Sequence, residues 1–402
     1  MSRTDGKRIH PGLVGLGMML IAFNLRPALT SVGPLLTEIR AETGLSAAGA
    51  ALLTTLPVLC LGLACALGPL AVRRIGTDAG VLAAILVVAL GNGLRGLGGL
   101  PFLYLGICLA AVGIGLAGVL LPGLVKRDFA ARAGIMTGLY TMVLCLGAAA
   151  GAGLTVPLAH AGGGWSLALA AWSLPALAAA LAWLPFARVR PVAEMTTRPS
   201  GTLWRDPLAW QVTGFMGLQS ALAYIVFGWL PAILQDRGLS ALDAGFVASI
   251  LSIGQMPAAL FVPALAARLR DQRGLVVGLI LLCIASFTAL VYGPVEQVML
   301  VAILLGLAVG GLFGLGLTII VLRARDAAGA AGLSTLAQGV GYTVASLGPL
   351  GFGLAHDAGG GWGWSTLLFA GIAAGSMVCG LGAGRDRFVG EPARLSPAPA
   401  HS

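Results

Sequence analysis

The chain has 402 residues, of which 58% are hydrophobic and only 10% are charged, and its mean hydropathy is +0.94. Because average soluble domains carry about a quarter charged residues, this composition excludes a soluble fold and makes the lipid bilayer the solvent. The formal net charge of +9 would suit a nucleic-acid partner, but the basic residues lie in short connections between long apolar runs, which excludes that class as well.

Twelve apolar runs follow one another, each long enough to cross a hydrocarbon layer of about 30 Å as a helix. They lack the alternation of polar and apolar residues that a β-barrel requires. In chain order we predict spans at residues 11–36, 46–72, 78–97, 101–125, 133–158, 165–186, 207–233, 243–267, 274–293, 296–322, 328–354 and 362–383. The sequence therefore predicts an all-α membrane protein of twelve transmembrane helices.

The longest polar interruption, at residues 187–206, separates the sixth run from the seventh. We expect an N-terminal six-helix half at 1–186, a linker at 187–206 and a C-terminal six-helix half at 207–402. The halves also repeat each other. The stretch that begins at Arg127 ends in LAHAGGGW, and the one that begins at Arg325 ends in LAHDAGGGW. Two pseudo-symmetric halves of this kind are typical of the major facilitator fold.

Basic residues fall mostly in alternate connections, beginning with the N-terminal segment. The opposite connections hold only three, Arg40, Arg95 and Arg237, together with six acidic residues. Since cytoplasmic connections carry the excess of Lys and Arg, we expect both termini and the linker in the cytoplasm and the protein in the cell inner membrane.

Arg26 lies near the middle of the first predicted span, where a buried cation costs about 3 kcal/mol. The central parts of the spans contain no Asp or Glu to neutralise it. One hypothesis is an arginine that locks helices together through carbonyl groups, and the other is a ligand for an anionic or polar solute. Pro27 and Pro34 follow it and permit a kink.

Other polar side chains recur within the spans. Gln338 and Tyr342 are four residues apart and share one helix face. The repeat sets Tyr140 against Gln338 and Asn24 against Gln219, which favours one cavity between the halves, although hydrogen bonds between helices explain any single residue equally well. The candidate substrate-binding residues are Arg26, Asn24, Tyr140, Gln219, Tyr224, Gln338 and Tyr342.

Motifs for catalysis, metals or nucleotides do not occur. The glycine-rich stretches GIGLAG (113–118) and GLAVGGLFGLG (306–316) have no preceding strand and no P-loop Lys-Ser/Thr, so close helix packing is the simpler interpretation. The six cysteines form no CxxC pair and lie in apolar runs. We therefore expect no enzyme activity, no cofactor and no metal site.

Four blocks resemble the cyanate/2-nitroimidazole permease family (CynX/NimT type) of the major facilitator superfamily. They are NLRPALTSVGPLL, VLLPGLVKRDF, AWQVTGFMGLQSALAY and LRARDAAGAAGLSTLAQGVGYTVASLGPL, and they are spread over both halves. The resemblance implies the twelve-helix fold of that superfamily and the transport of small polar compounds such as cyanate and nitroimidazoles.

The sequence thus predicts a secondary transporter that moves a small anionic or polar organic solute by alternating access, with Arg26 as the principal ligand. Multidrug-type efflux of apolar compounds and a non-transporting membrane sensor are the alternatives. The expected partners are the solute and the bilayer, without nucleic acid, and the expected state is a monomer. Uniport, proton coupling and exchange stay open, as does the direction of transport. His160 and His356, near the outer ends of their runs, serve proton handling or turn capping equally well.

Overall fold

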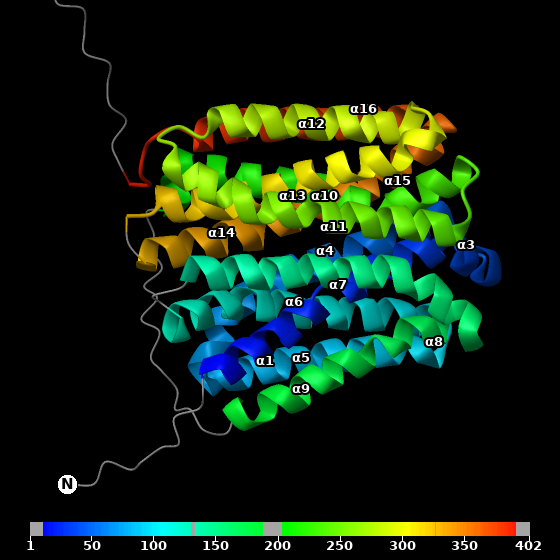
Figure 1. The fold of residues 1–402 in the computed structure, drawn as a ribbon, viewed down its shortest axis with the longest axis horizontal. Coiled ribbons are helices and arrows are strands. Elements are labelled where there is room, and N and C mark those ends of the chain that lie inside the picture. The colour runs from blue at the N-terminus through cyan, green and yellow to red at the C-terminus, as the bar shows by residue number, and fades with distance from the viewer. Residues whose placement is uncertain (1–10, 130–132, 188–202, 326, 391–402) are drawn as a thin grey trace, which may run out of the picture.

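The protein is described by a computed structural model over residues 11–129, 133–187, 203–325 and 327–390. Over these ranges the chain is built from helices joined by short turns, and no strand occurs in them (Figure 1). The all-α class predicted from the sequence is confirmed.

The helices that precede residue 188 form one group, which also contains the short 3-10 turn η1 (Arg95–Leu97). They are α1 (Pro11–Asn24), α2 (Pro27–Thr30), α3 (Val32–Thr43), α4 (Ala47–Ile75), α5 (Thr77–Leu94), α6 (Leu100–Asp128), α7 (Ala133–Gly162), α8 (Gly164–Ala171) and α9 (Ser173–Ala187).

The helices that follow residue 202 form a second group, with two further short turns, η3 (Leu203–Arg205) and η4 (Val295–Gln297). They are α10 (Pro207–Asp236), α11 (Ala241–Arg268), α12 (Arg273–Tyr292), α13 (Val298–Arg323), α14 (Ala327–Ala345), α15 (Leu347–Gly359) and α16 (Trp362–Ala383). Most of the predicted linker, 187–206, lies outside the described residues.

Each of the twelve predicted spans coincides with a helix or with an interrupted helix. Among the described residues, ten stretches are long and apolar enough to cross a membrane. The other two predicted spans are α4, whose apolar part runs from Leu52 to Gly68, and the pair α14 and α15, which is divided at Ser346. A multi-pass membrane protein is thereby established, while the count of twelve spans stays a prediction.

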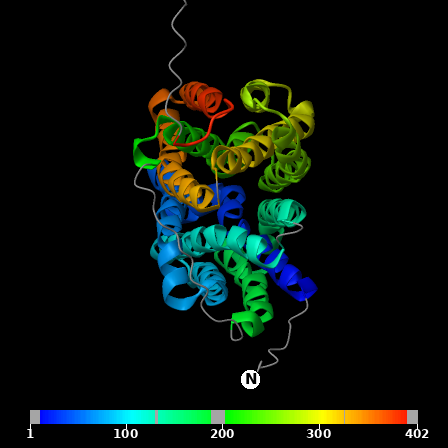
Figure 2. The same cartoon turned by 90° about the vertical axis from the view of Figure 1, so that its left-hand side faces the viewer.

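The helices run side by side, and the two groups meet along the middle of the molecule (Figures 1 and 2). Within the first group α5 and α4 pack against α6, and within the second α11 packs against α13 and α10 against α14 and α16. The groups contact each other mainly through α7 against α11 and through α4 against α14 and α15. These three helix pairs form most of the interface between the two groups.

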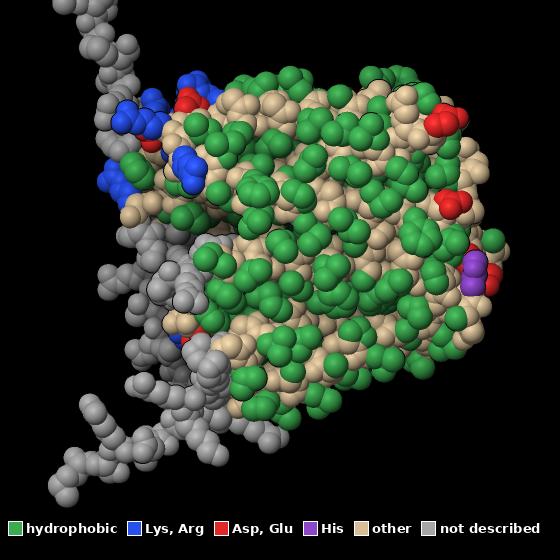
Figure 3. Space-filling model, in the orientation of Figure 1, with side chains coloured by type: hydrophobic (Ala, Val, Ile, Leu, Met, Phe, Trp, Pro, Cys, Tyr) green, Lys and Arg blue, Asp and Glu red, His purple; other side chains and the backbone are tan. Residues whose placement is uncertain are grey.

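Charged side chains gather at the two ends of the helices, and a broad hydrophobic belt separates them (Figure 3). The end with Lys and Arg, called here the arginine-rich end, includes the C-terminal ends of α6, α11 and α13. The opposite end, called the acidic end, includes the α3 to α4 and α10 to α11 connections. This distribution suits a protein that spans a bilayer with its helix axes near the membrane normal.

Glycines let the helix backbones approach closely. A Cβ at Gly113 of α6 would lie 2.5 Å from the carbonyl oxygen of Ala84, and one at Gly306 of α13 would lie 2.2 Å from that of Leu251. Both glycines belong to the glycine-rich stretches of the sequence, 113–118 and 306–316. These stretches serve helix packing, as small residues do at membrane helix interfaces.

Gly91 of α5 provides a test of this packing. A Cβ there would lie 2.4 Å from the backbone nitrogen of Ala110, so Gly91→Ala should cost about 1–3 kcal/mol of stability through overpacking and lower the melting temperature in detergent. Gly278→Ala is the matched control, because nothing lies within 4 Å of a Cβ at Gly278. Equal melting temperatures for the two variants would contradict the close approach of α5 and α6.

Candidate functional site

The first span is interrupted between α1 and α2, where Leu25 and Arg26 form a turn. Pro27 has no N–H group, so the carbonyl of Phe23, four residues earlier, loses its helical hydrogen bond. The backbone of α7 packs directly on this point: a Cβ at Gly147 would lie 2.0 Å from the Phe23 carbonyl oxygen. Local sequence and packing together thus place Arg26 outside regular helix.

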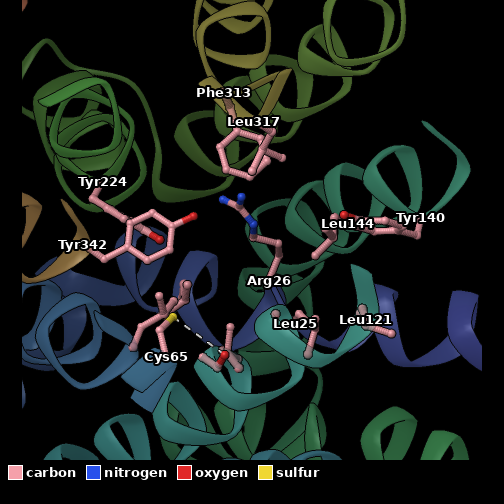
Figure 4. A pocket seen from close by; sticks show the side chains of 15 residues that line it. Leu25, Arg26, Cys65, Leu121, Tyr140, Leu144, Tyr224, Phe313, Leu317 and Tyr342 are labelled. Carbon is pink, nitrogen blue, oxygen red and sulfur yellow. Dashed lines mark hydrogen bonds between the residues drawn. The ribbon is translucent and has the colours of Figure 1, made fainter. Parts of the chain in front are cut away.

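A cavity with about 80 Å³ of space for water lies between the two helix groups, next to this turn (Figure 4). Its walls come from the α1–α2 turn, α2, α4, α6 and α7 of the first group and from α10, α13 and α14 of the second. Since one water molecule needs about 10–15 Å³ of such space, the cavity holds roughly five to eight water-sized groups. This is the size of a small organic solute.

Arg26 is the only charged side chain on the cavity wall that the described residues provide. Its guanidinium carbon lies 5.5 Å from the ring centroids of both Phe227 and Phe313. No hydrogen bond or ion pair joins this guanidinium to another described residue. Cation–π contacts contribute about 0.5–2 kcal/mol and leave the N–H groups unused, so these donors are free to bind a ligand.

Three tyrosines complete the polar lining. Tyr224 and Tyr342 lie on one side of Arg26 and Tyr140 on the other (Figure 4). The rings of Tyr224 and Tyr342 form an edge-to-face pair with centroids 6.2 Å apart. Their hydroxyl groups can both donate and accept hydrogen bonds, which suits a polar solute.

Gln338 lies behind the cavity wall. It accepts a hydrogen bond from the Tyr342 hydroxyl at 3.5 Å, and its amide nitrogen donates to the Ser334 hydroxyl at 2.7 Å. Gln338 therefore orients Tyr342 and is not part of the lining.

Asn24 and Gln219 also lie away from the cavity. The amide of Asn24 donates to the carbonyl oxygens of Leu20, at 2.8 Å, and of Pro175, at 3.1 Å, and so joins α1 to α9 within the first group. The amide nitrogen of Gln219 donates to the Met216 carbonyl at 3.1 Å, within α10 itself. The structure thus brings four of the seven candidates into one cavity, namely Arg26, Tyr140, Tyr224 and Tyr342.

The sequence did not single out Phe227 and Phe313, the two rings beside Arg26. An apolar ring in an apolar helix carries no signal of its own. The only hint was position, since Phe227 follows Tyr224 by three residues on one helix face and Phe313 falls within the glycine-rich stretch 306–316.

Contacts between the two groups close the cavity toward the acidic end. A Cβ at Gly33 of α3 would lie 3.0 Å from the Phe227 carbonyl oxygen, and one at Gly228 would lie 2.6 Å from the Thr54 methyl carbon. The Gln235 amide donates to the Pro34 carbonyl at 3.4 Å. In contrast, part of the cavity lining lies in the portions of α6, α7 and α13 nearer the arginine-rich end, at Leu121, Tyr140 and Leu317.

A model of the Major Facilitator Superfamily matches residues 15–346 and 216–395 of this chain. The chain is 38% identical over 374 residues to the "2-nitroimidazole transporter" of Escherichia coli (strain K12), covering 92% of this chain and 95% of that protein. It is 33% identical over 365 residues to the "Cyanate transport protein CynX" of the same strain, covering 89% and 94%.

Further similarity extends over the same length. The chain is 36% identical over 392 residues to the "Uncharacterized transporter YycB" of Bacillus subtilis (strain 168), covering 97% of this chain and 98% of that protein. Among solved structures, a bacterial homologue of the lysosomal transporter Spinster superposes with a TM-score of 0.72 at 16% identity, covering 98% of this chain and 100% of that one. A D-xylose-proton symporter gives 0.70 at 15% identity, covering 92% and 95%. The folds and the relatives are those of transporters and not of enzymes.

The different positions of Asn24 and Tyr224 generate a prediction. Asn24→Leu removes two hydrogen bonds between and within helices, each worth about 0.6 kcal/mol on average in membranes, and should lower the melting temperature. Tyr224→Phe is the control, because the described residues offer its hydroxyl no hydrogen bond and it should leave the melting temperature unchanged. A Tyr224→Phe protein that melted below Asn24→Leu would show that these assignments are reversed.

Proposed function

The chain belongs to the major facilitator superfamily, and from this premise we propose that it moves a small anionic or polar organic solute across the cell inner membrane by alternating access. The relatives named for 2-nitroimidazole and for cyanate support this class of solute. Cyanate is a small linear anion and 2-nitroimidazole is a small planar ring with a nitro group, and the hydrogen-bond acceptors of both suit a cavity of about 80 Å³ lined by one guanidinium and three phenols.

The observation that carries the proposal is the state of Arg26. Its guanidinium faces a cavity between the two helix groups with its donors unused by the described residues, although burial of a cation in the membrane is costly. The planar guanidinium grips a carboxylate, nitro or similar acceptor group with two parallel hydrogen bonds. A bound solute offsets the cost of keeping this charge in the apolar layer.

The helix arrangement supports alternating access. The contacts of Gly33, Gly228 and Gln235 lie between the cavity and the acidic end, and part of the lining extends toward the arginine-rich end. A solute in the cavity would therefore exchange with the arginine-rich side in this conformation. Rocking of residues 1–186 against residues 207–402 would open the opposite side, as expected for two six-helix halves around one central site.

We place the arginine-rich end in the cytoplasm, together with both termini and the linker at 187–206, because Lys and Arg accumulate on the cytoplasmic side of bacterial membrane proteins. The transporting unit is taken to be a monomer, since both halves of the site come from one chain.

Arg26→Ala tests the proposed ligand. Its affinity for cyanate and 2-nitroimidazole should fall at least roughly 30-fold, a loss of about 2 kcal/mol or more, because the bound solute loses its charged partner. Arg26→Lys should also bind poorly, since an ammonium lacks the planar fork. Binding is measured by isothermal titration on purified protein, and Arg40→Ala, at an exposed arginine of the acidic end, is the control.

In the alternative role, Arg26 holds helices together and does not bind the solute. The substitution should then affect the stability of the protein more than its affinity for the solute. Arg26→Ala would then lower the melting temperature and the yield, and the surviving protein would bind the solute normally. Thermal stability and affinity are therefore measured on the same samples. A destabilised Arg26→Ala protein with near-normal affinity would refute the ligand role.

The orientation is tested by thiol labelling in a chain whose six native cysteines are replaced. A cysteine introduced by Glu194→Cys should react with a membrane-impermeant maleimide only in inside-out vesicles, because we place residue 194 in the cytoplasm. Asp357→Cys, at an exposed position of the acidic end, should react only in intact spheroplasts. Labelling of position 194 from outside would overturn the orientation and the two-half arrangement.

A further inference from the structure

A second arginine without a carboxylate partner lies beside the interrupted first span. Arg95 follows α5 in the turn η1, and its side chain is 0% exposed. In the sequence it counts among the basic residues of the connections opposite the cytoplasmic ones, and it does lie in the turn between α5 and α6. In the structure it is buried in the first helix group, and no described Asp or Glu forms an ion pair with it.

The guanidinium of Arg95 bonds to both neighbouring elements. One terminal nitrogen donates to the carbonyl oxygen of Ala28, at 3.3 Å, and the other donates to the side-chain oxygen of Asn92. Ala28 belongs to α2, the single helical turn that directly follows Arg26. Arg95 therefore fixes the backbone two residues after Arg26, the arginine on the cavity wall.

The same hydrogen-bond chain continues across the first group. The Asn92 amide donates to the carbonyl of Trp172 at 3.2 Å, and the Trp172 indole donates to the Thr155 hydroxyl at 2.9 Å. Trp172 is the residue at which the sixth predicted span is interrupted between α8 and α9. This series of hydrogen bonds thus links the interruption of the first span to the interruption of the sixth.

Helix α7 holds α2 from another side. The Thr30 hydroxyl donates to the Ala148 carbonyl at 3.0 Å, and a Cβ at Gly151 would lie 2.4 Å from the Thr30 hydroxyl oxygen and 2.8 Å from the Pro27 Cα. With Arg95 on Ala28, α2 is fixed by two elements. A short helix with so few internal hydrogen bonds depends on such external contacts for its direction.

We infer that Arg95 is a positioning residue of the solute site: through the Ala28 carbonyl it fixes α2 and thereby directs the Arg26 side chain into the cavity. This inference rests on the proposed function of Arg26. Arg95 itself does not line the cavity and does not touch the solute. Its guanidinium is needed because one planar group must reach two oxygens, on α2 and on α5, at once.

The first test is binding. Arg95→Met keeps the volume but removes both hydrogen bonds, and it should weaken the affinity for cyanate and 2-nitroimidazole about tenfold, since small displacements of a binding group cost that much or more. Arg95→Lys keeps the charge and one hydrogen bond and should recover part of the loss. Arg237→Met is the matched control: Arg237 also donates to two carbonyls, of Leu290 and Gly293, but at the far side of the second group.

The second test does not need a substrate. In a chain without native cysteines, the thiol introduced by Arg26→Cys should react with a small methanethiosulfonate added from the arginine-rich side. Adding Arg95→Met should slow this reaction several-fold because position 26 turns away from the cavity, whereas adding Arg237→Met should not change it. If the native protein bound neither cyanate nor 2-nitroimidazole, the proposed function would fail. The labelling rate at position 26 would still decide whether Arg95 positions that residue.

Unchanged affinity together with an unchanged labelling rate for Arg95→Met would overturn the inference. If Arg95→Met did not fold, Asn92→Ala would replace it, since it removes one acceptor of Arg95 and the link to Trp172. A smaller but clear loss of affinity and of labelling rate is then expected. Equal values for Asn92→Ala and the parent protein would count against the positioning role.

Discussion

A helix that is interrupted inside a membrane must satisfy its freed backbone groups within the protein, because lipid offers no hydrogen bonds. In this chain the interruption at Leu25 and Arg26 imposes that constraint on its neighbours. Gly147 of α7 packs against the freed carbonyl of Phe23, Thr30 donates a hydrogen bond to α7, and Arg95 donates to Ala28 from the turn η1 after α5. The packing of three spans around the centre of the first group follows from one broken turn.

The same interruption divides the site between the two groups. The first group supplies the charge of Arg26, and the second supplies the rings of Phe227 and Phe313 that face it. Neither group alone encloses the guanidinium. Any movement of one group against the other therefore changes the surroundings of the charge, which is the physical link between the position of Arg26 and a transport cycle.

The fold was largely predictable because the length and apolarity of each run are local properties of the chain. Within the candidate site, Arg26 was the clearest signal, because a charge is unexpected in the middle of an apolar span, and the three tyrosines were weaker signals that the structure also places in the cavity. Whether Asn24 and Gln219 faced the cavity depended on the rotation of their helices, and runs that are apolar all round do not encode that rotation. The burial of Arg95 was not predictable for a related reason, since a basic residue at a helix end indicates a connection, and only the packing of the neighbouring spans shows that it is buried.

Arg26 and Arg95 are both cations without an acidic partner among the described residues, and placing either of them within the helix bundle is costly. Their environments nevertheless differ. Arg95 donates to Ala28 and Asn92, and Arg323 similarly donates to the carbonyls of Ala383 and Gly384. The terminal nitrogens of Arg95 thus find acceptors within the protein, whereas its Nε is buried without one among the described residues, and these hydrogen bonds serve the architecture. Arg26 differs because its N–H groups face a cavity and have no acceptor among the described residues, so a bound molecule can supply the missing acceptors. For the arginines compared here, that condition holds for Arg26 and supports its proposed role as the solute ligand, with Arg95 in the proposed positioning role.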